Sequence, residues 1–191
     1  MKALKYSLMF LLAMFIAFAC NEENLDLKPL TETEAGFFDE EIDYQRSVVA
    51  LYSKLADHYT YNNNNWMHEF FFLSGDDITS NNAYSFEIFS TLQPGDGDLN
   101  RAYDLYYQLV NRTNTFLEKI EMDKERGESV FGSTSTRDNM EGEALFLRGF
   151  TNFMLWNYFG TSPVITERIS TQDKINPPSS DGIALLDQAI S

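Results

Sequence analysis

The most restrictive feature of this sequence is the stretch GEALFLRGFTNFMLWNYF, which lies within residues 137–159 and is apolar on almost every side of a helix. A helix without a polar face has to be covered by neighbouring elements on several sides. Gly160 follows the stretch and can end the helix in a left-handed conformation, and Pro163 prevents its continuation. We therefore expect a mainly α-helical fold in which other helices pack around this one.

Two earlier stretches show the three-to-four-residue spacing that is typical of an amphipathic helix. In the first, Asp39 is placed as the N-cap, with Glu40 and Glu41 in the first turn. Its expected apolar face consists of Ile42, Gln45, Val48, Val49, Tyr52, Leu55 and Tyr59. In the second stretch, Asp98 is the expected cap. Its apolar stripe consists of Ala102, Tyr103, Tyr106, Leu109, Val110, Thr113, Phe116, Leu117 and Ile120.

The remaining segments are less regular. Between Tyr61 and Gly97 the sequence is rich in Asn, Asp and aromatic residues without a sustained period, so this part is expected to be the least helical. A final helical pattern begins at Asp181 and stops at Ser191 without a C-terminal Gly or a basic last turn. This ending predicts a fragment or a truncated product rather than a complete domain.

The first nineteen residues differ from the rest of the chain. A basic start with Lys2 and Lys5 is followed by twelve apolar residues, 8–19, a run shorter than the about 20 residues that a membrane span needs. The run matches the hydrophobic core of a secretory signal peptide, with small residues before the cut. Residues 1–19 are therefore predicted to be a signal peptide.

Cys20 is the only cysteine of the chain, so no disulfide can form within it. Its place directly after the signal peptide resembles the lipidation site of a bacterial lipoprotein, in which several acyl chains anchor the protein at about 0.8 kcal/mol per buried methylene. The alternative is an unmodified cysteine inside an uncleaved leader. Glu22 and Glu23 resemble an acidic pair that directs some lipoproteins to the outside of the outer membrane. Residues 20–36 are expected to form the lipidated tether.

Charge and polar side chains narrow the possible partners. The net charge of −15 argues against nucleic acid, because a phosphate backbone would be repelled. A sugar site needs flat apolar faces and groups that hydrogen-bond to hydroxyls. One cluster combines aromatic rings with amide groups, and its candidate ligand-binding residues are Tyr61, Asn62, Asn63, Asn64, Asn65 and Trp66. A second cluster offers polar groups alone, and its candidate residues are Asp76, Asp77, Asn81 and Asn82. The alternative is that these aromatic residues pack in the core and the polar ones form turns and caps.

No pattern predicts a metal, a cofactor or a catalytic centre. Residues 96–100 begin with the alternating oxygens of a calcium loop, but Arg101 replaces the expected Gly, so we interpret them as a helix cap. His58 and His68 do not complete a zinc site. The sequence has no G-x-S-x-G motif, and no spacing singles out a glycosidase pair among its many carboxylates.

Three segments of the sequence are EALFLRGFTNFMLWNYFGTSPVI, YDLYYQLVNRTNTFLEKI and FFDEEIDYQRSVVALYSKL. Together with Cys20, they resemble the SusD/RagB family of outer-membrane lipoproteins. In the first, Glu143 and Arg148 belong to the family motif and are interpreted as a structural polar pair rather than as catalysts. Gly149 stands where the family usually has Ala, at a cost of about 1 kcal/mol in helix propensity. Asn114, in the second segment, also matches the family.

The resemblance implies tetratricopeptide-like helix pairs with irregular loops over residues 37–191, which would form an incomplete N-terminal SusD-like domain. It also implies a non-enzymatic protein, lipid-anchored at the outer membrane and facing the cell exterior. Such a protein binds glycans and delivers them to a SusC-like TonB-dependent transporter. Two alternatives are a lipid-anchored polysaccharide hydrolase and a helical scaffold that contacts the transporter without a ligand of its own.

Overall fold

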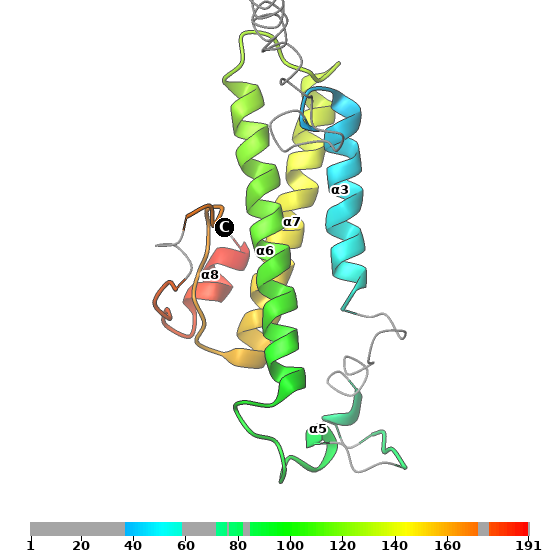
Figure 1. The fold of residues 1–191 in the computed structure, drawn as a ribbon, viewed down its shortest axis with the longest axis vertical. Coiled ribbons are helices and arrows are strands. Elements are labelled where there is room, and N and C mark those ends of the chain that lie inside the picture. The colour runs from blue at the N-terminus through cyan, green and yellow to red at the C-terminus, as the bar shows by residue number, and fades with distance from the viewer. Residues whose placement is uncertain (1–36, 59–71, 76, 82–84, 172–175, 191) are drawn as a thin grey trace, which may run out of the picture. The chain divides into compact units, whose positions relative to one another are not determined.

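Three long helices and two short ones account for most of the residues that the computed structural model describes, which are 37–58, 72–75, 77–81, 85–171 and 176–190. The helices are α3 (Glu41–Ala56), α5 (Ser85–Ile88), α6 (Gly97–Lys124), α7 (Thr134–Phe159) and α8 (Ala184–Ile190). No β-strand occurs among these residues, which confirms the predicted mainly α-helical fold. Figure 1 shows α3, α6 and α7 side by side, with α8 on the other side of the α6–α7 pair from α3.

Helix α6 carries the central apolar stripe. It begins after the N-cap Asp96, whose side chain accepts a hydrogen bond from the backbone N–H of Asp98 at 2.9 Å. The cap lies two residues before the predicted one, because the carboxylate at position 96 reaches a free N–H of the first turn. The stripe is buried as predicted, and its least exposed members are Ala102, Tyr106, Leu109, Val110, Thr113, Phe116 and Ile120.

Helix α7 is covered on several sides, as its apolar composition requires. It contacts α6, α8 and α3. It begins after Ser133, whose hydroxyl accepts a hydrogen bond from the N–H of Thr136, and it ends at Gly160, which has a φ of 65°. The predicted end of this helix at Gly160 is therefore confirmed. Phe146 and Phe153 are 64% and 41% exposed, so within the described part of the chain the covering of α7 is incomplete.

The buried face of α3 differs from the predicted one. Tyr44 and Leu51 are almost completely buried, whereas Val49 is 68% exposed and Tyr52 is 41% exposed. Val48 is buried and belongs both to the predicted face and to the face that is buried in the structure. Apolar residues recur with helical spacing on either side of Val48, so the sequence pattern fits both faces, and packing against α6 and α7 selects the one that is buried.

The start of α3 also differs from the prediction by one residue. The N-cap is Glu40, which forms a capping box with Asp43: each side chain accepts a hydrogen bond from the backbone N–H of the other residue. Such a box needs an acceptor three residues after the cap. Asp39, the predicted cap, has the apolar Ile42 at that position.

An aromatic cluster joins α3 to α6 and to the loop after α6. The ring of Tyr44 lies 4.9 Å from that of Phe38, 6.0 Å from that of Phe116 and 4.7 Å from that of Phe131, all between ring centroids. Its hydroxyl donates a hydrogen bond to the carbonyl oxygen of Lys119 at 3.1 Å. Such edge-on and tilted contacts stabilise a core beyond the burial of area alone.

Helix α8 approaches α7 closely at Gly149. A Cβ atom at this position would lie 2.7 Å from the carbonyl oxygen of Ala189. The missing side chain therefore makes room for the backbone of α8, which explains a Gly inside a helix. Leu185 of α8 is fully buried in one core cluster with Leu155 of α7. The helix begins three residues after its predicted start at Asp181.

Candidate functional site

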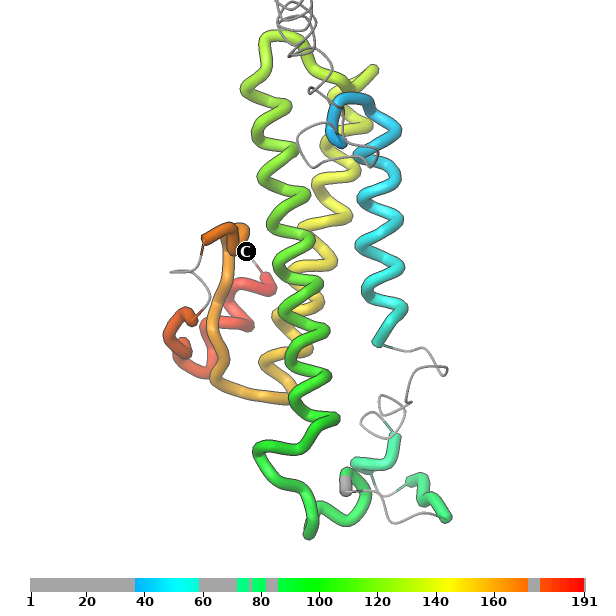
Figure 2. Tube along the Cα trace, viewed as in Figure 1, coloured from blue at the N-terminus to red at the C-terminus, as the bar shows by residue number. Residues whose placement is uncertain are grey.

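A non-helical segment, residues 163–169, runs along α6 and is called the strap below (Figure 2). Two residues of α6 hold its ends. The hydroxyl of Tyr107 donates a hydrogen bond to the carbonyl oxygen of Pro163 at 2.7 Å, and the Oδ1 of Asn111 accepts one from the backbone N–H of Ile169 at 2.8 Å. Both contacts are made to the backbone of the strap, so they fix its path independently of its side chains.

Asn114 holds the middle of the strap. Its Nδ2 donates hydrogen bonds to the carbonyl oxygens of Ile165 at 3.0 Å and Glu167 at 3.1 Å. Its Oδ1 accepts a hydrogen bond at 3.0 Å from the Nη1 of Arg148 on α7, which also lies 3.5 Å from the carbonyl oxygen of Thr166. The three α6 residues that hold the strap are four and three positions apart, and they therefore share one face of the helix.

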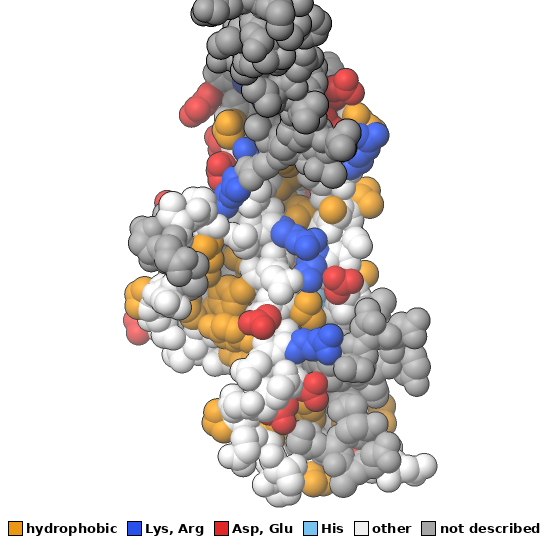
Figure 3. Space-filling model, in the orientation of Figure 1, with side chains coloured by type: hydrophobic (Ala, Val, Ile, Leu, Met, Phe, Trp, Pro, Cys, Tyr) orange, Lys and Arg blue, Asp and Glu red, His pale blue; other side chains and the backbone are white. Residues whose placement is uncertain are grey.

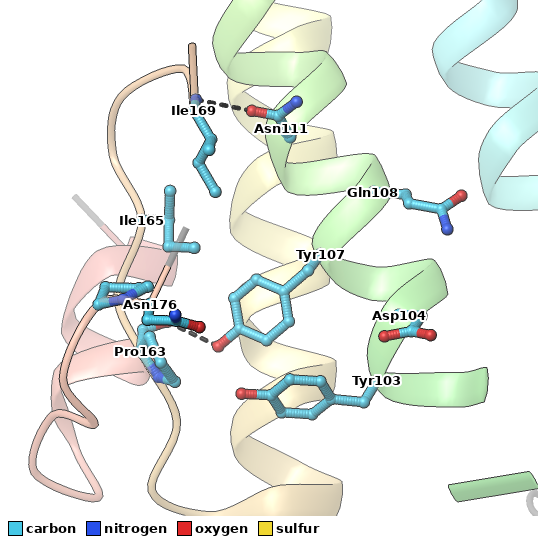
Figure 4. A pocket seen from close by; sticks show the side chains of 10 residues that line it. Tyr103, Asp104, Tyr107, Gln108, Asn111, Pro163, Ile165, Ile169 and Asn176 are labelled. Carbon is cyan, nitrogen blue, oxygen red and sulfur yellow. Dashed lines mark hydrogen bonds between the residues drawn. The ribbon is translucent and has the colours of Figure 1, made fainter. Parts of the chain in front are cut away.

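Between α6 and the strap lies a groove of about 500 Å³, called the tyrosine groove below. Its lining residues are Tyr103, Asp104, Tyr107, Gln108, Asn111, Pro163, Ile165, Ile169, Asn176 and Pro177. Figure 4 shows Tyr103, Tyr107 and Asn111 directed toward the strap, whereas Asp104 and Gln108 project from the helix on the side away from it. A continuous apolar surface is visible beside α6 on the strap side (Figure 3).

Two tyrosine rings form the floor of this groove. The centroids of Tyr103 and Tyr107 are 4.6 Å apart, and Tyr103 also packs edge-on against Phe159 at 5.2 Å. Burial, followed by the neighbouring Tyr103, raises the pKa of Tyr107 far above its usual range, so its hydroxyl stays protonated and keeps its bond to the strap. The floor is thus an uncharged surface, which is held in place by the contact of Tyr103 with Phe159 and by the hydrogen bond of Tyr107 to Pro163.

The edge of the groove is polar. Asn176 is exposed and Asn111 is half-buried, and the exposed side chains of Asp104 and Gln108 project farther from the strap. Amide groups both donate and accept hydrogen bonds, and a carboxylate accepts them, which suits a ligand with several hydroxyl groups. The tyrosine rings suit the C–H face of such a ligand. The groove therefore combines the two kinds of surface that a sugar ring requires.

A second cavity, of about 660 Å³, lies beside the end of the strap, next to the later part of α6 and to α7. Its lining residues are Asn114, Leu117, Glu118, Glu121, Met122, Glu125, Glu141, Leu145, Arg148, Thr166, Glu167, Arg168 and Ser170. It is much more strongly charged than the tyrosine groove. On its edge Lys124 bridges Glu121 at 2.7 Å and Glu141 at 2.8 Å, which links α6 to α7. These ionic contacts are partly exposed, so each stabilises the fold only weakly.

Comparison with known proteins identifies the family. Residues 23–180 match the model of a SusD-like family that is described as starch-binding and associating with the outer membrane. The chain belongs to this family. A solved SusD superfamily protein from Bacteroides vulgatus ATCC 8482 shares the fold of the SusD-like chain with a TM-score of 0.64 and 21% identity, over 80% of this chain and 33% of that one.

A second solved structure is also similar to the SusD-like chain. It is a SusD-like carbohydrate-binding protein from Bacteroides fragilis NCTC 9343, with a TM-score of 0.51 and 17% identity, over 81% of this chain and 30% of that one. The SusD-like chain thus spans about a third of the length of these relatives. No curated protein matches it.

Most of the predicted site residues of the SusD-like chain lie outside the described residues: Cys20, Tyr61, Asn62, Asn63, Asn64, Asn65, Trp66, Asp76 and Asn82. Asp77 and Asn81 are described, and both are exposed. Between them, Thr79 and Ser80 donate hydrogen bonds to the carboxylate of Glu87 on α5, which ties this loop to the helix. Neither Asp77 nor Asn81 lines the tyrosine groove.

The tyrosine groove has no local signal in the sequence. Tyr103 fits the apolar stripe of α6, and its role in a groove depends on the strap, about sixty positions later in the chain. Glu143 and Arg148 are interpreted from the sequence as a structural polar pair, whereas the hydrogen bonds of Arg148 go to Asn114 and to the carbonyl oxygen of Thr166. Burial, followed by the nearby carboxylate of Glu143, raises the pKa of Tyr52 on α3. Helical spacing explains the difference, since residues five positions apart do not share a face.

The one described histidine, His58, is buried against α6. Its Nδ1 lies 3.2 Å from the carbonyl oxygens of Lys54 and of Leu55, and its ring centroid is 4.5 Å from that of Tyr106. Burial lowers the pKa of His58, so the ring is neutral and donates its Nδ1 proton to the helix. The described parts of the chain contain no group of three or more His, Cys, Asp or Glu side chains that could bind a metal ion. Among the described residues, no helix is both long and apolar enough to span a membrane.

Proposed function

We propose that this SusD-like chain belongs to a cell-surface protein that binds glycans and delivers them to a SusC-like TonB-dependent transporter. The observation that carries the proposal is the family match over residues 23–180, since that family is described as starch-binding and associating with the outer membrane. The similar protein from B. fragilis, described as carbohydrate-binding, supports it. The proposed role is binding, without catalysis.

The tyrosine groove is the proposed ligand site in the described part of the chain. Tyr103 offers a ring surface, and Asn176 offers an exposed amide at the edge. Among the described lining residues only Asp104 is charged. A groove with one negative charge and no positive one favours uncharged sugars over sugars that carry carboxylate or sulfate groups.

The two clusters predicted from the sequence remain proposed ligand contacts. The cluster from Tyr61 to Trp66 combines aromatic rings with four asparagines, and the cluster from Asp76 to Asn82 supplies carboxylates and amides. The exposure of Asp77 and Asn81 is compatible with a contact to ligand. Trp66→Ala tests the first cluster, and unchanged affinity in a folded variant removes it from the proposed site.

Anchoring and domain organisation belong to the same proposal. Residues 1–19 act as the signal peptide, Cys20 carries the acyl chains, 20–36 are the tether and 37–191 form the N-terminal SusD-like helical region. Mass spectrometry of the native protein should find acyl groups at Cys20, and Cys20→Ala should release the protein from the membrane fraction. Protease treatment of intact cells should then degrade the wild-type protein, because the proposed location is the outer face of the outer membrane. An unmodified thiol or full protection from protease contradicts this part of the proposal.

Affinity electrophoresis of the purified protein in gels with soluble starch and a panel of other polysaccharides tests the binding function. We expect retardation by at least one neutral polysaccharide without release of reducing ends. Tyr103→Ala should weaken binding roughly fivefold or more through loss of the ring surface. Tyr52→Ala is the matched control, because Tyr52 is a partly exposed tyrosine on α3 outside the groove.

Other outcomes contradict specific parts of the proposal. Release of reducing ends would identify a hydrolase. Absence of retardation with every polysaccharide would leave the scaffold alternative. Equal affinities of the Tyr103→Ala and Tyr52→Ala variants would place the ligand outside the tyrosine groove.

A further inference from the structure

The strap forms a wall of both cavities. Pro163, Ile165 and Ile169 line the tyrosine groove, whereas Thr166 and Arg168 line the second, charged cavity. The strap has no helical hydrogen bonds of its own. Its position, and therefore the width of the tyrosine groove, depends on the side chains that hold its backbone and on the packing of Val164 and Ile165 against the core cluster.

Among those side chains, Asn114 has no surface in the tyrosine groove. It lines the charged cavity, and it is 3% exposed. Its amide makes two hydrogen bonds to strap carbonyls, one of them at Ile165, whose side chain lines the groove. Tyr107 and Asn111 also hold the strap, but they line the groove themselves. Asn114 therefore affects the groove only through the strap.

The orientation of the Asn114 amide is determined by its surroundings. Arg148 has only hydrogen-bond donors, so the amide oxygen must face it, and the distance between them is 3.0 Å. The amide nitrogen then faces the strap, where the carbonyl oxygens can only accept. Burial lowers the pKa of Arg148, and hydrogen bonds to the Asn114 oxygen and the Thr166 carbonyl compensate for the partial loss of water.

We propose that Asn114, oriented by Arg148, is a positioning residue for glycan binding: it sets the wall of the tyrosine groove without touching the ligand. The proposal rests on the proposed function. It differs from a general role in stability, because loss of the Asn114 amide donor should free the strap while α6 and α7 remain folded. The aromatic cluster contains no strap residue, and the buried members of the core cluster belong to α5, α6, α7 and α8, although Val164 and Ile165 of the strap also pack against that cluster.

Asn114→Asp tests this inference. The variant has the same shape and keeps an oxygen for Arg148, but it presents a second oxygen to the strap carbonyls and so replaces two attractive contacts by repulsive ones. Asn139→Asp is the matched control, since Asn139 is an exposed residue of α7 and the change adds the same charge. Each purified protein is examined by affinity electrophoresis with soluble starch and the polysaccharides bound by wild type, by circular dichroism and by hydrogen–deuterium exchange.

We expect Asn114→Asp to bind about tenfold more weakly than wild type, in line with the loss of two hydrogen bonds. The amide of Ile169 should exchange faster, although its own partner Asn111 is unchanged. Amides in the middle of α6 should keep their protection. Asn139→Asp should match wild type in all three measurements.

Each result supports or overturns the inference. Faster strap exchange with wild-type affinity overturns the positioning role and leaves the binding function intact. Unchanged strap exchange shows that Asn114 does not hold the strap. A wild-type protein that binds no polysaccharide refutes the proposed function itself, and the positioning role falls with it. If Asn114→Asp loses its helical signal, Arg148→Met replaces it, because methionine has no N–H to donate and no longer fixes the amide. Normal binding by that folded variant overturns the inference.

Discussion

Gly149→Ala is the substitution for which sequence and structure predict opposite effects. From the sequence alone, Ala inside a helix is more favourable than Gly by about 1 kcal/mol. In the structure, the added Cβ would lie 2.7 Å from the carbonyl oxygen of Ala189, 3.6 Å from its carbonyl carbon and 3.7 Å from its Cα. All three atoms belong to the backbone of α8, so no side-chain rotation relieves the contact.

The magnitude follows from these two opposing effects. An extra methyl group in a packed interface typically costs about 1–3 kcal/mol, because α8 must move away from α7. After subtraction of the gain in helix propensity, Gly149→Ala should lower the free energy of unfolding by about 0–2 kcal/mol. Gly142→Ala, on the same helix with no atom within 4 Å of the added Cβ, should raise it by up to about 1 kcal/mol.

Urea unfolding, followed by far-ultraviolet circular dichroism, measures both variants. Their difference removes the propensity effect that they share, so it isolates the contact with α8 and should be about 1–3 kcal/mol. Equal stabilisation by the two substitutions would refute the reasoning. It would mean that the backbone of α8 does not lie against Gly149 in solution.

Three further predictions concern groups outside the groove. Tyr44→Phe should lower the free energy of unfolding in urea by about 1 kcal/mol through loss of the hydroxyl bond to α6, and Tyr44→Ala by about 3–5 kcal/mol through the cavity in the aromatic cluster. Asp123→Asn should cost about 1–3 kcal/mol in the same assay, since the buried carboxylate accepts from the hydroxyl of Ser129 at 2.6 Å and from the N–H of Val130 at 3.0 Å, and an amide cannot accept both. Burial lowers the pKa of His58 below its usual 6.5, so the unfolded chain binds a proton more readily than the folded one, and stability should fall as the pH drops below about 6.5. His58→Gln should reduce this fall between about pH 7 and pH 5.5, and an identical fall in both proteins would contradict the assignment.

The helices could be predicted from the sequence because their signals are local. The α6 stripe and the stop of α7 at Gly160 depend on spacing and on one backbone conformation, and both are confirmed. The buried face of α3 could not be predicted, because Val49 and Tyr44 lie on two faces that are both apolar. Only the positions of α6 and α7 decide between them.

The candidate site depended on contacts between distant segments. Nothing near Tyr107 in the sequence indicates that its hydroxyl will bind the backbone of Pro163, fifty-six positions later. Asn114 and Arg148 were identified by resemblance as motif residues, but their contact across thirty-four positions becomes visible only after α6 and α7 are packed. The family itself, in contrast, could be recognised from the sequence because several motifs occur in the family's order.

The attachment of the strap through its backbone makes the tyrosine groove open to redesign. The hydrogen bonds at Ile165 and Ile169 use a carbonyl oxygen and an N–H that nearly every amino acid retains. Side-chain libraries at position 169, together with apolar substitutions at position 165, which packs against the core cluster, should therefore yield variants with altered sugar preference on an unchanged scaffold. Proline at position 169 is the exception, because it has no N–H to offer Asn111.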